Sequence, residues 1–70
     1  MNYKSIIGGN IRKVRLEQGW TQEKLAIRSQ VTYEYINRLE NGKMNVSIET
    51  LLRIAKALKT PFASLVDGLN

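Results

Sequence analysis

The amino-acid sequence predicts an all-α fold, a compact single domain of five helices that takes up residues 1–70. Two observations lead to this prediction. Apolar residues recur at the three- and four-residue spacings of amphipathic helices, with good N-cap residues before these stretches. The chain also shows no pattern typical of a sheet, a repeat or a linker. Because a chain of this size buries only roughly 60% of its unfolded surface, association with a second copy is a natural source of stability.

The first helix is expected to carry four apolar residues along one stripe: Tyr3, Ile7, Ile11 and Val14. Gly8 and Gly9 are unfavourable inside a helix, each by roughly 0.5–1 kcal/mol relative to alanine. We therefore expect a weak first turn and a helix that tightens near Asn10. The alternative is that Gly8 lets a neighbouring backbone approach closely. Gly19 ends this helix, and Trp20 is expected to cover its junction with the next one.

Residues 21–41 are typical of two short helices joined by a tight turn, a helix-turn-helix. Thr21 and Thr32 suit the two N-caps, and Gly42 is placed to end the second helix. A left-handed conformation at Gln30, in the turn, would cost on the order of 1 kcal/mol. The outer face of the second helix carries four polar residues: Tyr33, Glu34, Asn37 and Arg38. Such a face on a basic domain suits the major groove of DNA.

The C-terminal part predicts two further helices. Ser47 caps the fourth helix, whose inward stripe is expected to comprise Ile48, Leu51, Leu52, Ala55 and Leu58. Ile54 lies at the edge of this stripe and is not required for the core. Thr60 and Pro61 form a cap followed by a first-turn proline, which opens a short fifth helix through Val66.

The composition indicates a nucleic-acid-binding protein and argues against an enzyme. Eleven Lys and Arg residues against six acidic ones give a net charge of +5, and the pI is about 9.9. The absence of cysteine and histidine excludes disulfides, histidine-based hydrolytic triads and ordinary zinc sites, so we expect no cofactor and no metal. No membrane span or signal peptide is visible, and we expect a cytoplasmic protein associated with the nucleoid of a bacterium, or encoded by a phage.

The run WTQEKLA…VTYEYINRLENGK…NVSIETLLRIAKAL resembles the helix-turn-helix domain of the phage-repressor and Cro family, also called the xenobiotic-response-element family. It is especially similar to small restriction–modification controller proteins. The resemblance covers about Ile7 to Leu65 and implies a five-helix, lambda-repressor-like DNA-binding domain. Gln30 departs from the family pattern, which often has glycine in the turn.

The candidates for reading bases are Tyr33, Glu34, Asn37 and Arg38. Arg38 can pair with guanine through two hydrogen bonds, although a phosphate contact or a solvated side chain is the alternative. Tyr33 offers its ring to a thymine methyl group. Glu34 either accepts from cytosine or serves as a favourable charge in the first helical turn. Asn37 is a secondary candidate.

Six residues are candidates for contacts with the DNA backbone: Thr21, Gln22, Thr32, Tyr35, Lys43 and Asn45. The resemblance implies that the two caps lie near phosphates, where helix N-termini attract anions. Gln22 is expected to bind a phosphate or to brace a reading side chain, and Tyr35 to reach a phosphate or to pack at the helix junction. The resemblance further implies a partly buried ion pair between Arg15 and Glu40, which joins the first helix to the third.

Residues 47–66 are predicted to mediate dimerisation. Four apolar residues exceed what the core of one small domain needs: Ile54, Phe62, Leu65 and Leu69. Val46 is expected to join them at the rim of the dimer interface. The alternative is that Phe62 and Leu65 fold under and cap the core of the monomer.

The predicted function is that of a sequence-specific transcriptional regulator that binds an inverted-repeat operator as a homodimer. A restriction–modification controller or a Cro-like repressor that regulates its own expression fits this description. The partners expected are double-stranded DNA with a pseudo-palindromic operator, a second copy of the chain and, as a further candidate, RNA polymerase. Two alternatives are an antitoxin of a toxin–antitoxin pair and a non-specific nucleic-acid-binding domain.

Overall fold

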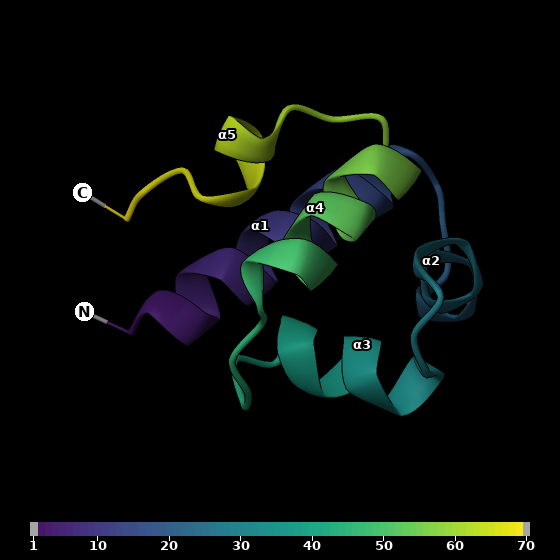
Figure 1. Ribbon diagram of the computed structural model, residues 1–70, viewed down its shortest axis with the longest axis horizontal. Helices are drawn as coiled ribbons and strands as arrows, with labels where there is room; N and C mark the ends of the chain where they lie inside the picture. Colours follow the sequence, from purple (N-terminus) through teal and green to yellow (C-terminus); the bar gives the residue numbers. More distant parts are fainter. Residues whose placement is uncertain (1, 70) are drawn as a thin grey trace.

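The computed structural model describes residues 2–69, and within them it contains five α-helices and no strand, which confirms the all-α prediction. The helices are α1 (Tyr3–Glu17), α2 (Gln22–Ser29), α3 (Tyr33–Glu40), α4 (Ile48–Ala57) and α5 (Phe62–Leu65). Figure 1 shows α2 and α3 at a steep angle to each other, and both ends of the described chain at one side of the domain.

The helices enclose one small core. Helix α2 packs against α3 and α4, α1 packs against α3 and α5, and α5 also contacts α4. The largest apolar side chains in the core are Ile11, Leu25, Ile36, Leu39, Leu51, Ile54, Leu58 and Leu65. Every helix contributes at least one of them, so no helix can be removed without exposing the apolar stripes of its neighbours.

Helix α1 begins at Tyr3 with a capped first turn. Its N-cap is Asn2, whose side-chain oxygen accepts hydrogen bonds from the backbone N–H groups of Lys4 at 3.1 Å and Ser5 at 3.4 Å. The expectation of a weak first turn that tightens only near Asn10 is therefore wrong. Gly8 is buried instead, and a Cβ there would overlap the carbonyl oxygen of Leu39. The alternative interpretation is the correct one: Gly8 lets the backbones of α1 and α3 approach each other closely.

The caps of the helix-turn-helix are confirmed. The hydroxyl of Thr21 accepts from Lys24 N, and that of Thr32 accepts from Tyr35 N, both at 3.0 Å. Gln30 ends α2 in the left-handed conformation, with φ 61° and ψ 41°. A glutamine in this conformation costs on the order of 1 kcal/mol, which the packing of α2 on α3 offsets.

The inward face of α4 differs from the expected one. Ile48 and Leu52 are 64% and 51% exposed, whereas Ile54 is completely buried. The buried residues are Leu51, Ile54, Ala55 and Leu58, which follow the i, i+3, i+4, i+7 spacing of one helix face. The sequence offers more apolar positions than one face can hold, and only the packing against α2 and α5 selects among them.

Helix α5 is shorter than predicted, and its leucine belongs to the core. It starts at Phe62, with Pro61 in the N-cap position and no side-chain cap. Leu65 is completely buried, so its assignment to a dimer interface is wrong, as is that of Ile54. The Asn10 amide donates to the carbonyl oxygens of Leu65 at 3.0 Å and Asp67 at 2.9 Å, which fastens the C-terminal segment to α1.

A buried ion pair joins α1 to α3, as the resemblance implied. Arg15 Nε lies 2.7 Å from Glu40 Oε2, and Arg15 Nη2 lies 2.9 Å from Glu40 Oε1. The third guanidinium nitrogen, Nη1, donates to the carbonyl oxygen of Trp20 at 2.6 Å. Trp20 itself packs against the core at the junction of α1 and α2, as predicted. One guanidinium thus ties the end of α1 both to the turn before α2 and to the end of α3.

Replacing Gly8 should separate α1 from α3. Gly8→Ala should lower the free energy of unfolding by about 1–3 kcal/mol, because the new methyl group must displace the backbone of α3. Gly9→Ala is the matched control: a Cβ there meets nothing within 4 Å, so this change should raise stability by roughly 0.5–1 kcal/mol. Urea denaturation measures both. Equal stabilisation by the two changes would contradict the close approach at Gly8.

Removing the charge of Glu40 should destabilise the fold strongly. The side chains of Arg15 and Glu40 are only 8% and 1% exposed, so Glu40→Gln leaves a buried guanidinium without its counter-charge, at a cost of about 3 kcal/mol. Glu17→Gln, an exposed carboxylate at the end of α1, should change stability by less than about 0.5 kcal/mol. Thermal melting compares them, and coincident curves for the two variants would refute the role given to the ion pair.

Candidate nucleic-acid interface

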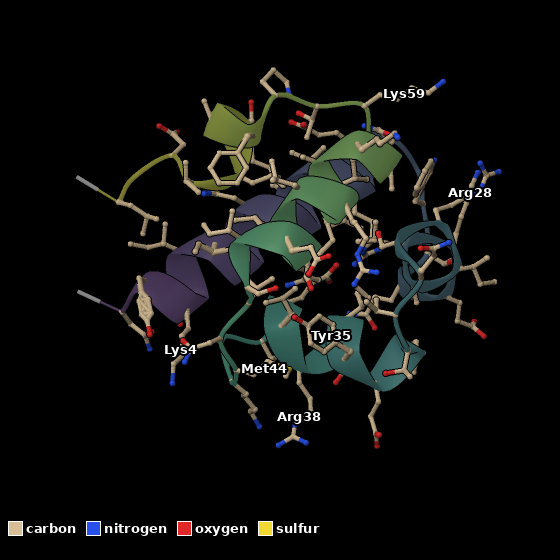
Figure 2. All side chains as sticks on the ribbon, viewed as in Figure 1. Lys4, Arg28, Tyr35, Arg38, Met44 and Lys59 are labelled. Carbon is tan, nitrogen blue, oxygen red and sulfur yellow. The ribbon has the colours of Figure 1, made fainter. Side chains whose placement is uncertain are left out.

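Helix α3 has one buried face and one polar, exposed face. Ile36 and Leu39 point into the core, while Tyr33, Glu34 and Arg38 are exposed. Figure 2 shows the Arg38 guanidinium extending away from the body of the domain. The structure therefore brings three of the four predicted base-reading residues onto one free surface.

The fourth, Asn37, is half-buried and is held by a chain of hydrogen bonds. Its Nδ2 donates to Gln22 Oε1 at 3.2 Å, and Gln22 Nε2 donates to Glu40 Oε1 at 3.0 Å. Because Glu40 also binds Arg15, the chain runs from the buried ion pair to the edge of the exposed face. Gln22 braces a residue of α3, which is one of the two roles expected of it. These hydrogen bonds hold the Asn37 amide in one orientation, and its second N–H and its oxygen remain available to a ligand.

The two threonine caps are exposed and lie at the N-termini of α2 and α3. Their oxygens accept from backbone N–H groups, and each hydroxyl hydrogen remains available as a donor. Lys43 and Asn45, just beyond α3, are also exposed. Tyr35 is half-buried and packs against the core, which supports the packing role over a phosphate contact.

One basic residue near this surface was missed by the sequence analysis. Lys4 lines the same shallow depression as Met44 and Asn45, and Figure 2 shows Lys4, Met44 and Arg38 toward the same edge of the domain. The hydroxyl of Tyr3 donates to Asn45 Oδ1 at 2.6 Å and ties the start of α1 to this loop. No local pattern reveals this, because Lys4 and Asn45 are distant in sequence and meet only through the packing of α1 on α3.

The predicted dimer residues divide into two groups. Val46, Phe62 and Leu69 are half-buried and keep some surface, whereas Ile54 and Leu65 keep none. Ile48 and Leu52 were expected in the core, yet they are exposed and lie one turn apart on α4. We call these two residues the α4 stripe.

The structure also bears on metals and membranes. Residues 2–69 hold no group of three or more His, Cys, Asp or Glu side chains arranged to bind a metal ion. Of the helices described here, none has both the length and the apolar character needed to cross a membrane.

Comparison with known proteins agrees with this geometry. The helix-turn-helix family model matches residues 11–65. The control protein C.BamHI from Bacillus amyloliquefaciens is 34% identical over 67 residues, which cover 94% of this chain and 83% of that protein. The restriction–modification controller protein C.AhdI from Aeromonas hydrophila superposes with a TM-score of 0.86 at 32% identity, over 89% of this chain and 94% of that one.

A third relative has been solved with DNA. The controller protein C.Esp1396I, as a tetramer in complex with its natural 35-base-pair operator, gives a TM-score of 0.84 at 34% identity, over 93% of this chain and 86% of that one. The capped angled helices, the buried ion pair and these matches lead to one conclusion: the chain belongs to the helix-turn-helix family of transcriptional regulators, which includes the restriction–modification controller proteins.

Proposed function

We propose that the protein is a sequence-specific transcriptional regulator that binds an inverted-repeat operator as a homodimer. The observation that carries this proposal is the polar face of α3, whose position is set by a buried ion pair and not by flexible loops. A reading helix held in this way keeps its side chains in fixed positions. Specific contacts with base edges in the major groove require such fixed positions.

The residues on this surface divide by chemistry. Arg38 is the candidate for a bidentate contact with guanine, and Tyr33, Glu34 and Asn37 complete the base-reading set. Thr21, Thr32, Lys43 and Asn45 are placed for phosphate contacts, which orient the protein but carry no sequence information directly. Lys4 joins them at the start of α1.

The similarity to control proteins points to the biological role. The match spans 83% of C.BamHI and 94% of C.AhdI, so it includes most of each protein and not just a shared module. We infer a controller or Cro-like repressor that regulates its own expression, acts on the nucleoid in the cytoplasm and has no enzymatic activity. Contact with RNA polymerase would accompany any activating role.

The dimer that we propose uses the α4 stripe. Ile48 and Leu52 are large, apolar and more than half exposed, as expected of residues that a second copy covers. Val46, Phe62 and Leu69 are half-buried candidates for the same interface. A two-fold pair would present two α3 helices about 34–36 Å apart, one turn of DNA, and so match two half-sites.

Arg38 and Lys43 should respond differently to truncation. Arg38→Ala should cost about 1–3 kcal/mol per half-site and relax the preference at one base position. Lys43→Ala should weaken binding evenly across sequences and reduce the slope of log affinity against log salt by about 0.9 for each phosphate that it no longer neutralises. Selection from a random DNA pool, followed by binding at several salt concentrations, separates the two effects. A folded Arg38→Ala protein with an unchanged consensus would contradict its role, and a wild type with no consensus would indicate non-specific binding.

The α4 stripe should control the oligomeric state. Leu52→Lys should shift the protein from dimer to monomer, because it places a charge in the apolar contact and its repulsion occurs twice across the two-fold axis. Ile27→Lys is the matched control, since Ile27 is 75% exposed on α2 and lies outside the proposed interface. Sedimentation equilibrium at micromolar concentration distinguishes them. A wild-type protein that stays monomeric, even on an inverted repeat, would exclude the homodimer.

A further inference from the structure

A second basic surface lies apart from the reading helix. Four cationic side chains line a concave pocket of about 470 Å³ between the C-terminal ends of α2 and α4: Arg28, Arg53, Lys56 and Lys59. Among the described residues that line it, none is acidic. Figure 2 shows Arg28 and Lys59 pointing outward on the α2 side and at the upper edge, far from Arg38 at the lower edge.

The charges in this pocket exceed what the helix ends require. Arg28 and Lys56 stand in the last turns of α2 and α4, where cations favour the helix dipole. Two such helix ends carry together about −1 elementary charge, so the four cations leave a surplus of about three. Within residues 2–69 none of the four lies within ion-pair distance of a carboxylate. Stabilisation of the helices therefore accounts for only part of the cluster.

An unsatisfied hydroxyl stands in the wall of the same pocket. Ser29 is 1% exposed, and its Oγ is a buried side-chain atom that makes no hydrogen bond within residues 2–69. A buried polar group without a partner destabilises a fold, and such a group calls for a specific explanation. Because this oxygen is itself closed to solvent, it would donate to an anion in the pocket only if binding rearranged the wall.

One of the cations also lies near an aromatic ring. The Arg28 guanidinium carbon lies 5.9 Å from the centre of the Trp20 ring, at the outer limit of a cation–π contact, and Lys24 Nζ lies nearer to the same ring at 4.6 Å. Arginine forks and lysine ammonium groups together suit the several oxygens of a phosphoryl group. The volume of about 470 Å³ falls within the range of roughly 300–1,000 Å³ typical of sites for small ligands.

We propose that this pocket, between the ends of α2 and α4, binds a phosphoryl anion that is larger than a single phosphate. The pocket is separate from the surface proposed to read the operator. The anion is either a free phosphorylated small molecule or the phosphate backbone of nucleic acid that passes this side of the domain. Because the site is complete in one chain, its existence does not depend on the proposed operator binding.

Titration of the full chain with pyrophosphate, without DNA and at constant ionic strength, tests the site. Amide signals of Ser29, Gln30 and Ala57, which line the pocket, should shift in a saturable way in two-dimensional NMR spectra. The double change Arg53→Gln with Lys56→Gln should weaken pyrophosphate binding on the order of tenfold, because it removes two charge-assisted contacts. Ser29→Ala should also weaken binding, without a change in the net charge.

The matched control removes two charges elsewhere. Arg12→Gln with Lys13→Gln neutralises exposed cations on α1 and should leave pyrophosphate binding unchanged. Shifts that do not saturate, or an equal loss in both double variants, would show only general attraction to a basic protein and would overturn the proposal. The spectra of the variants also show directly that each remains folded.

A second arm identifies the source of the phosphoryl group. If a free ligand is the natural occupant, pyrophosphate should bind equally to the protein in complex with duplex DNA. If nucleic-acid phosphates fill the pocket, a duplex with long flanks should displace pyrophosphate. The Arg53 and Lys56 double variant should then lower the salt slope of DNA binding by about 0.9 for each phosphate that is no longer neutralised. Either outcome supports the site, whereas absence of saturable pyrophosphate binding to the DNA-free chain contradicts it even if operator binding is intact.

Discussion

The bidentate ion pair between Arg15 and Glu40 is the interaction on which the placement of the reading helix depends. It crosses from α1 to α3, takes the Trp20 carbonyl into the same network and passes through Gln22 to Asn37. A buried pair of this kind adds little to stability by itself, because desolvation offsets most of the attraction. Its value lies in geometry: in this arrangement of α1, α2 and α3, all three guanidinium nitrogens of Arg15 and both carboxylate oxygens of Glu40 have hydrogen-bond partners.

The shortness of the helices explains why such contacts are needed. Helices α2 and α3 have eight residues each, and isolated helices of that length are marginal in water. Threonine caps supply part of the missing stability, and the close approach at Gly8 lets α1 support α3 along its backbone. The exposed face of α3 is then free to carry polar residues chosen for contact with a ligand and not for folding.

The domain carries three surface regions that differ in chemistry. The α3 face carries the polar residues proposed to read bases, the α4 stripe is apolar, and the pocket between the ends of α2 and α4 is purely cationic among its charged residues. Since each lies on a different combination of elements, substitutions in one need not disturb the others. This arrangement is possible because, within residues 2–69, only ten apolar side chains form the buried core.

The sequence by itself determined the local features: the all-α class, the caps at Thr21, Thr32 and Ser47, and the polar face of α3. Each depends on residues within one or two helical turns, so periodicity and capping chemistry suffice. The Arg15–Glu40 pair came from the family resemblance, since nothing local joins positions so far apart. Only the tertiary structure decided that Gly8 lies against the backbone of α3, that Ile54 and Leu65 are buried, and that Ile48 and Leu52 are exposed. Those outcomes depend on which neighbouring helix covers each face, and that is a property of the whole packing.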